Sequence, residues 1–208
     1  LKLEDYYKVY VGIVAKGIKQ FLSSTKDTIH YKKYLQGKHI APYQIIFKSV
    51  YINFIPELLH SNTDQFVYEQ KEKILVRKTG NILMASLDSE QYYTDQSLYN
   101  LDLKPNKWYS NKVLLAILNS KLLNYYYNKK LITNADVFPY IKGVHLKMFP
   151  LPHLSDRIES ELSNLVDSII QHKKQNIDTS VICNKIDTLV YQLYGLTDAE
   201  IEIIEQSI

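Results

Sequence analysis

The chain has 208 residues and a mass of 24.3 kDa, and 46% of its residues are hydrophobic and 23% are charged. This composition is typical of a globular protein and excludes the disordered, collagenous and membrane-spanning classes. A single cysteine, Cys183, cannot form an internal disulfide, so we expect a cytoplasmic protein. The apolar runs are far shorter than the roughly 20 residues that a bilayer-spanning helix needs, so we expect no membrane partner. The first residue is Leu1 rather than Met, and we expect the chain to be a fragment of a longer protein.

The net charge of +3 is unevenly distributed along the chain. Residues 1–150 contain 21 Lys/Arg against 12 Asp/Glu and hold 16 of the 18 tyrosines, whereas residues 151–208 contain 4 Lys/Arg against 10 Asp/Glu. Such asymmetry is typical of a chain whose first part faces a polyanion, although 23 Lys against 2 Arg also fits a simple coding bias. We therefore expect a recognition body, residues 1–152, and a tail, residues 153–208.

The body predicts short strands followed by one helix. Gly80-Asn81 lies between two of the strand-like segments and predicts a hairpin. From Lys112 to Tyr127, apolar residues occupy much of a helical circumference, which indicates a central helix buried against a sheet. The segments rich in β-branched and aromatic residues, which predict strands, are 9–14, 43–47, 50–54, 74–78, 82–87, 92–93 and 98–101.

The tail predicts three helices, over 156–175, 179–194 and 197–204, because apolar residues recur there with a helical period. Ser155 suits the N-cap of the first helix, Gly195 suits a left-handed end of the second, and Thr197 with Glu200 has capping-box spacing. The expected fold class is α+β, with a mixed, mainly antiparallel sheet in the body, a central buried helix and a C-terminal helical tail that packs on the body or on a partner catalytic module.

The sequence contains few of the motifs that indicate an enzyme. It has no Gly-x-Gly-x-x-Gly loop, no Walker motif and no paired His or Cys ligands, so we assign no catalytic residue and no metal ligand. One loose pattern, Glu57, Glu69 and Lys71, fits the arrangement with which some nucleases hold magnesium. Two carboxylates and a lysine at such spacing arise often by chance, so a solvated surface is the preferred interpretation.

Basic residues cluster in three places, and in two of these places aromatic residues lie among them. Lysines there can neutralise phosphates, and Arg77 can read a guanine edge. Each cluster alone also fits a solvated charged face, but three in one basic body favour nucleic-acid binding. The clusters are Lys71, Lys73, Arg77 and Lys78; Lys107, Trp108, Tyr109 and Lys112; and Tyr125-Tyr126-Tyr127 with Lys129-Lys130.

An ordered set of stretches resembles the C-terminal specificity domain of TaqI-like DNA methyltransferases and of fused restriction-modification enzymes. The set covers nearly the whole chain. The stretches are VGIVAKGIKQF (11–21), KKYLQGKHIAPY (32–43), KILVRKTGNILMASLDSEQYYTDQSLYNL (73–101), LLAILNSKLLNYYY (114–127) and HLKMFPLP (145–152), with LVYQLYGLTDAEIEIIE (189–205) similar to the usual end of such proteins.

This resemblance implies a target recognition domain that selects a DNA sequence for an adenine-specific methyltransferase. In that family an N-terminal module of the same chain binds S-adenosylmethionine and carries an Asn-Pro-Pro-Tyr motif, which is absent here. The resemblance therefore implies that this chain alone does not methylate. It implies a parent enzyme that methylates adenine, with magnesium where it also cleaves as a restriction endonuclease. The expected partners are double-stranded DNA and the methyltransferase module.

The candidate DNA contacts follow from charge and aromatic character. They are Lys71, Lys73, Arg77, Lys78, Lys107 and Lys112, with Tyr92, Tyr93 and Tyr109 as groove or sugar contacts that also fit a half-buried core. Three alternatives remain open: a fragment of a type I restriction specificity subunit, a magnesium-dependent nuclease using Glu57, Glu69 and Lys71, and a protein-interaction domain.

Overall fold

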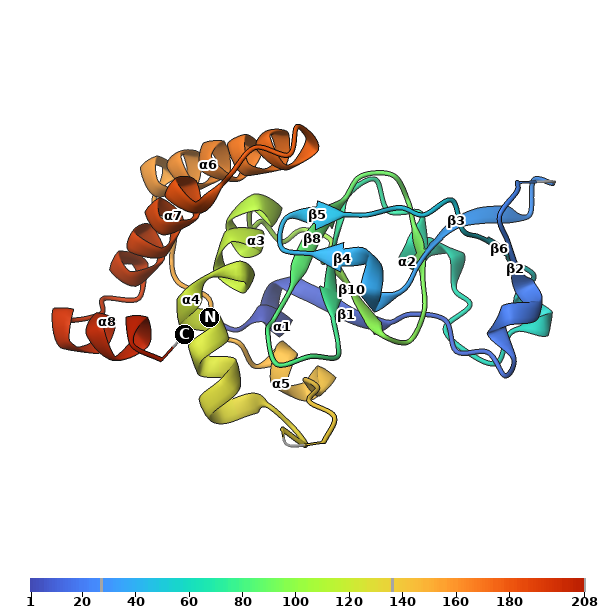
Figure 1. Ribbon diagram of the computed structural model, residues 1–208, viewed down its shortest axis with the longest axis horizontal. Coiled ribbons are helices and arrows are strands. Elements are labelled where there is room, and N and C mark those ends of the chain that lie inside the picture. Colours follow the sequence, from blue (N-terminus) through green and yellow to red (C-terminus); the bar gives the residue numbers. More distant parts are fainter. Residues whose placement is uncertain (27, 136, 208) are drawn as a thin grey trace.

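A four-stranded antiparallel sheet forms the middle of the molecule. The computed structural model describes residues 1–26, 28–135 and 137–207. The strand order is β1 (Tyr7–Val11), β10 (Leu98–Leu103), β7 (Lys73–Arg77) and β8 (Ala85–Asp88). Along the long axis, helices lie on one side of this sheet and a smaller sheet lies on the other (Figure 1). The expected α+β class with a mainly antiparallel sheet is confirmed.

Alternate residues of the central strands face opposite sides, as the period of a strand requires. Ile74, Val76 and Leu101 join the core formed with the helices α3 (Asn111–Asn119) and α4 (Lys121–Tyr126). Leu75 and Leu98 face the other way, toward Leu35, Ile40 and Tyr92. The hairpin of β4 (Ile40–Ala41) and β5 (Gln44–Ile45) covers that side, and the Ser86 hydroxyl lies 2.7 and 2.9 Å from its Ala41 and Gln44 carbonyls.

The smaller sheet has the order β2 (Leu22–Ser23), β6 (Tyr51–Asn53), β3 (Tyr31–Leu35) and β9 (Tyr93–Thr94). Its own core contains Ile52, Phe54, Tyr68 and Tyr93, closed by α2 (Gln65–Tyr68) and the short turns η1 (Ile18–Phe21) and η3 (Pro56–Leu58). β3 and β9 pair in parallel, and β9 leads directly into β10. This pairing joins the small sheet to the start of a central strand.

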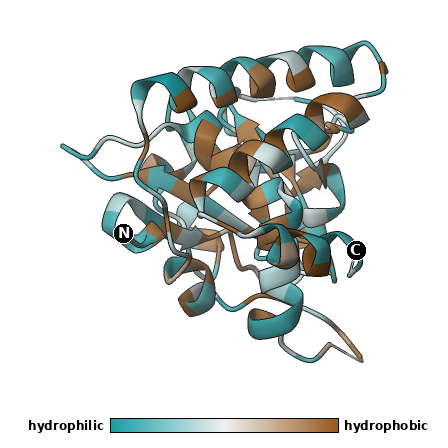
Figure 2. Ribbon diagram, turned by 90° about the vertical axis from the view of Figure 1, so that its left-hand side faces the viewer, coloured by the Kyte–Doolittle hydropathy of each residue, from teal (hydrophilic) through white to brown (hydrophobic). Residues whose placement is uncertain are grey.

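The three tail helices are confirmed as α6 (Asp156–Lys174), α7 (Ser180–Leu193) and α8 (Asp198–Glu205). Gly195 has a positive φ of 66°, and Thr197 and Glu200 form the expected capping box. Ser155 lies at the N-cap of α6 but its side chain makes no capping hydrogen bond. Figure 2 looks onto this helical side, where hydrophobic and hydrophilic residues alternate along each helix. Buried tail residues share one core with α3: Leu162, Val166, Ile169, Ile186 and Val190.

The expected helix over 112–127 is interrupted. α3 ends at Asn119, and Ser120, with ψ of 156°, is both its C-cap and the N-cap of α4. Beside the break, the Asn119 side-chain oxygen accepts the Ala85 N–H at 2.9 Å and its nitrogen donates to the Ala85 carbonyl at 3.0 Å, as a neighbouring strand would. The Ser120 hydroxyl accepts the Leu123 N–H and so caps the start of α4. A π-helical turn, η4 (Tyr127–Leu131), then continues the chain.

Three short helical segments complete the description. α1 (Leu3–Tyr6) precedes β1, η2 (Gly37–His39) lies between β3 and β4, and α5 (Gly143–Lys147) precedes the tail. Over the ranges that the structure describes, no helix has both the length and the apolar character needed to cross a bilayer.

Candidate nucleic-acid interface

Four segments from distant parts of the sequence meet at the end of the central sheet where β7 finishes and β10 begins. The Lys78 N–H donates to the Ser97 carbonyl at 2.9 Å, the Ile141 N–H to the Lys78 carbonyl at 3.0 Å, and the Gly80 N–H to the Pro139 carbonyl at 2.8 Å. We call this surface the loop platform and define it as residues 36–39, 78–80, 95–97 and 138–142.

A half-buried carboxylate, that of Asp95, holds two segments of the platform together. Asp95 accepts hydrogen bonds from the Ser97 N–H at 3.0 Å, from the Ser97 hydroxyl, and from the Gln36 amide at 3.3 Å. The Ser97 hydroxyl oxygen in turn accepts the Gly37 N–H at 2.7 Å. Burial raises the pKa of Asp95, and these hydrogen bonds oppose that rise. The Asp95 carboxylate is thus engaged in hydrogen bonds within the protein. The positively charged lysines of the platform lie on its outer surface.

The outer surface of the platform is basic and hollowed. Lys38, Lys78 and Lys142 form no ion pair with any carboxylate in the part of the chain that the structure describes. The Lys78 ammonium lies 5.8 Å from the centre of the Tyr99 ring. A hollow of about 490 Å³ lies at the centre, and the residues that line it are Lys78, Thr79, Gln96, Ser97, Phe138 and Tyr140. Ammonium, amide and hydroxyl groups beside aromatic rings suit phosphates and base edges.

Two expected contact residues, Arg77 and Lys78, lie at or beside the platform. Arg77 is half-buried at the end of β7, and its Nη1 lies 3.8 Å from the Met84 sulfur. Its Nε is buried with no hydrogen-bond partner among residues 1–26, 28–135 and 137–207. Arg77 also forms no ion pair in these ranges, so no carboxylate there neutralises its charge.

Lys73 is not on an exposed face, and this corrects the expectation that its charge lies at the surface. Its side chain is 0% exposed, its ammonium lies 2.6 Å from Asp88, and it donates to the Tyr68 carbonyl at 2.7 Å. Burial lowers the pKa of Lys73, and the Asp88 carboxylate opposes that shift. The lysine therefore joins β7, β8 and α2 within the core.

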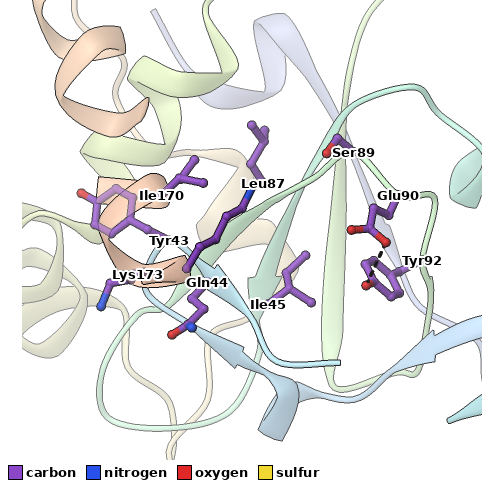
Figure 3. Close-up of a pocket in the computed structure, with 10 residues that line it drawn as sticks. Tyr43, Gln44, Ile45, Leu87, Ser89, Glu90, Tyr92, Ile170 and Lys173 are labelled. Atoms are coloured by element: carbon purple, nitrogen blue, oxygen red, sulfur yellow. Dashed lines mark hydrogen bonds between the residues drawn. The ribbon is translucent and has the colours of Figure 1, made fainter. Parts of the chain in front are cut away.

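The three expected tyrosine contacts are also buried. Tyr93 donates to Glu69 at 2.8 Å, and Tyr109 donates to the Pro152 carbonyl at 3.3 Å. Tyr92 lines a separate hollow of about 200 Å³ between the β4–β5 hairpin and α6, where its hydroxyl donates to Glu90 at 3.3 Å (Figure 3). Their hydroxyls form hydrogen bonds within the protein, which fits the half-buried core that the sequence also allowed for these tyrosines.

Lys71, Lys107 and Lys112 lie at the opposite end of the central sheet. Lys71 precedes β7 and Lys78 follows it, so an extended strand separates them by roughly 20 Å. The register pairs Leu101 with Ile74, which puts the end of β10 and the loop carrying Lys107 near Lys71. Lys112 is ion-paired with Asp167 of α6 at 2.6 Å. The structure therefore divides the expected basic residues between two ends of the sheet.

One carboxylate of the nuclease pattern, that of Glu69, is engaged by side chains of the fold. Glu57 lies in η3, while the Glu69 carboxylate receives hydrogen bonds from Gln65 at 2.7 Å, Tyr93 at 2.8 Å and Lys32 at 3.1 Å. The Gln65 hydrogen bond is the main cause that lowers the pKa of Glu69. Nowhere in the described ranges do three or more His, Cys, Asp or Glu side chains form a group that could hold a metal ion.

Most of the platform was not anticipated from the sequence. Gln36, Lys38, Gln96, Tyr140 and Lys142 lie on it, in segments up to about a hundred positions apart along the printed sequence. The Asp95-Gln96-Ser97 stretch just before β10 has the composition of a turn, which was the one local signal available.

Three comparisons place this fold among known proteins. The model of the TaqI-like C-terminal specificity domain matches residues 32–151, which contain the whole platform. A protein of Methanocaldococcus jannaschii named "Putative type II restriction enzyme and methyltransferase" is 30% identical over 202 residues, covering 92% of this chain but only 17% of that relative.

Solved structures show the same fold at low identity. The type IIL restriction-modification enzyme MmeI in complex with DNA superposes with a TM-score of 0.63 at 10% identity, over 91% of this chain and 33% of that one. The type I restriction-modification S subunit from M. genitalium gives a TM-score of 0.51 at 13% identity, over 84% and 38%. Because the family model covers more than half of the residues, the chain belongs to the family of TaqI-like C-terminal specificity domains.

Proposed function

We propose that this chain recognises a specific sequence in double-stranded DNA on behalf of an adenine-specific methyltransferase or a fused restriction-modification enzyme, and that the loop platform is its DNA face. Membership of the specificity-domain family makes DNA recognition the function of the chain. The observation that carries the assignment to the platform is that three of its lysines have no carboxylate partner in the described ranges, and that one of them, Lys78, lines a hollow together with amide, hydroxyl and aromatic groups.

Contacts to the phosphates and contacts to the bases would have different roles in DNA binding. Lys38, Lys78 and Lys142 would neutralise phosphates, which supplies most of the affinity and makes it sensitive to salt. Phosphate contacts fix the protein on the duplex, and side chains that reach the base edges select the sequence. A methyltransferase that takes adenine out of the stack needs the duplex held in this way.

The catalytic partner would be a methyltransferase module elsewhere in the parent protein. The M. jannaschii relative is about six times longer than the region it shares with this chain, and its name includes a methyltransferase. The residues here do not fit S-adenosylmethionine, since the sequence has neither a Gly-rich cofactor loop nor Asn-Pro-Pro-Tyr. That cofactor, and magnesium in a parent that cleaves, would belong to the other module.

The type I alternative rests on one observation, the fold shared with the M. genitalium S subunit. The sequence of the parent gene distinguishes the two: a methyltransferase motif in the same chain favours the fused enzyme, and a second copy of the recognition unit favours the type I subunit.

Salt-dependent DNA binding tests the platform. We expect Lys38→Glu with Lys78→Glu to weaken binding of the 208-residue chain to duplex DNA at least tenfold, and to lower the slope of log K against log salt by about 2, one for each lost phosphate contact. Fluorescence anisotropy between low and moderate salt measures both quantities.

The matched control is Lys185→Glu, a charge reversal at an exposed lysine on α7. If the double platform variant binds DNA as the control does, the platform is not the DNA face.

A further inference from the structure

We propose that Gln96 is a specificity-determining residue that reads an adenine in the major groove, and that Asp95 and Ser97 are the residues that position it. This inference rests on the proposed function, because it requires a duplex on the loop platform.

The main chain on both sides of Gln96 is fixed. Asp95 donates its N–H to the Leu35 carbonyl at 3.1 Å and accepts the Leu98 N–H at 3.1 Å. Its peptide also packs against Gly12, where an added Cβ would lie 2.1 Å from the Asp95 carbonyl oxygen. Ser97 is held by the Lys78 and Gly37 N–H groups and by the Asp95 carboxylate. Gln96 therefore projects from a backbone that cannot easily shift.

The side chain of Gln96 is free in contrast to its neighbours. It is exposed, it lines the platform hollow with Lys78 and Thr79, and it makes no side-chain hydrogen bond within the described ranges. By contrast, the amide of the neighbouring Gln36 donates a hydrogen bond to Asp95. A rigid backbone that carries an uncommitted amide is the arrangement that direct readout of a base requires, because less side-chain and loop order is lost on binding.

The amide selects the base by its pattern of donor and acceptor. Adenine presents the N7 acceptor and the N6 donor in the major groove, which one carboxamide can satisfy together. Guanine presents two acceptors there, N7 and O6, and leaves the amide oxygen unpaired. Phe138 and Tyr140 supply an apolar wall of the same hollow, suited to the methyl group of the paired thymine.

Selection from a randomised duplex pool tests the assignment with the 208-residue chain itself. For the unaltered chain we expect one position of the enriched site to be adenine. Gln96→Ala should reduce discrimination at that position by about tenfold to a hundredfold. Gln96→Glu should shift preference there toward cytosine, because a carboxylate accepts from the cytosine N4 amino group. The matched control, Gln171→Glu on the exposed side of α6, should leave the selected sequence unchanged.

Ser97 variants test the positioning role. Ser97→Ala removes the hydroxyl that joins Asp95 to Gly37, and we expect weaker discrimination at the Gln96 position with the other positions retained. Ser97→Thr keeps the hydroxyl and should restore the discrimination, a rescue that a general loss of stability would not produce. Equal selectivity of the Ala variant and the unaltered chain overturns this role.

The two failures are distinguishable. If the unaltered chain enriches no duplex, the proposed function falls and this inference falls with it. If it enriches a defined site that both Gln96 variants select unchanged, only the assignment of Gln96 is overturned.

Discussion

The side chain of Lys73 shows how the environment of a charge decides its role. Its ammonium is completely buried, with the Asp88 carboxylate at 2.6 Å. Asp88 also accepts the Glu90 N–H at 2.8 Å and the Tyr92 N–H at 3.0 Å, so one ion pair fixes the turn after β8. A buried ion pair of this kind contributes little more to stability than a well-packed apolar pair would. Removal of one partner, however, leaves the other charge buried without compensation and is strongly destabilising.

Lys73→Met should therefore lower the free energy of unfolding by about 3–5 kcal/mol. Urea denaturation followed by circular dichroism measures the change. Lys33→Met, which removes the partner of Glu90 from a surface ion pair, is the control and should cost no more than about 1 kcal/mol. Equal effects of the two substitutions would contradict a structural role for Lys73.

Asp187 gives the fold a dependence on pH. Burial raises the pKa of this α7 carboxyl to about 6, against the hydrogen bond it accepts from the Lys121 N–H at 2.8 Å. Between about pH 4 and 6 the folded chain then binds more protons at this site than the unfolded chain, so the contribution of Asp187 to stability falls as pH rises.

Asp187→Asn keeps the acceptor and removes the titration. We expect the stability of this variant relative to the unaltered chain to rise between pH 4 and pH 7, by an amount on the order of 2–3 kcal/mol. Denaturation at a series of pH values measures the difference. A difference that stays constant with pH would show that Asp187 does not titrate in this range.

At the scale of elements, the sequence predicted what depends on local pattern. The three tail helices and most central strands follow apolar periodicity, and Gly195 and Thr197 end one helix and begin the next. β3 (Tyr31–Leu35) was not predicted, because Lys32 and Lys33 interrupt its apolar pattern and their partners Glu69 and Glu90 are distant in sequence. The break at Ser120 was not predicted either, and it lies beside a contact between Asn119 and Ala85 of β8 that local pattern does not reveal.

Substitutions at Gly195 test how much its left-handed backbone conformation at the end of α7 contributes to stability. Its φ of 66° favours glycine, and no atom lies within 4 Å of the position that a Cβ would occupy. Gly195→Ala should thus cost about 1 kcal/mol from backbone strain alone, and Gly195→Asn should cost less, because asparagine tolerates this conformation. Thermal denaturation of the two variants gives the ranking, and the reverse order would point to a contact rather than to strain.

For the whole molecule, the tail is part of the body's core. Leu162, Val166 and Ile169 pack with α3 in one continuous cluster. The sequence-based boundary at residue 152 marks a change of composition, and the buried side chains cross it. A chain of residues 1–152 would expose these apolar surfaces of α3 to water.

We expect the 1–152 chain to show no cooperative unfolding transition. A chain of residues 1–195, which lacks only α8, should still unfold cooperatively at a lower temperature, since it loses the Lys121–Glu205 ion pair and the Tyr191–Glu205 hydrogen bond. Calorimetry compares the two. A cooperative transition in the shorter chain would show that the body folds alone.

The candidate site was predicted less completely than the fold. Charge composition indicated a polyanion partner, and Arg77 and Lys78 were identified from the sequence. The rest of the platform is created by strand order, which brings the ends of β3, β7 and β9 together beside β10. The local sequence pattern contains no information about which distant segments become neighbours. It therefore could not show that Lys38 and Gln96 belong to the same surface.

The bonds between Lys78 and Ser97, Ile141 and Lys78, and Gly80 and Pro139 all join main-chain atoms. Every residue except proline carries the same main-chain donor and acceptor, so these three bonds depend little on the side chains of the segments, apart from Gly80, whose φ of 125° favours glycine. If the platform is the DNA face, as proposed, substitutions on the outward side of the segments would change the sequence that is recognised while the scaffold beneath stays folded. A lineage that acquires a new target, or an engineer who designs one, would then find on the platform a surface that tolerates such exchange.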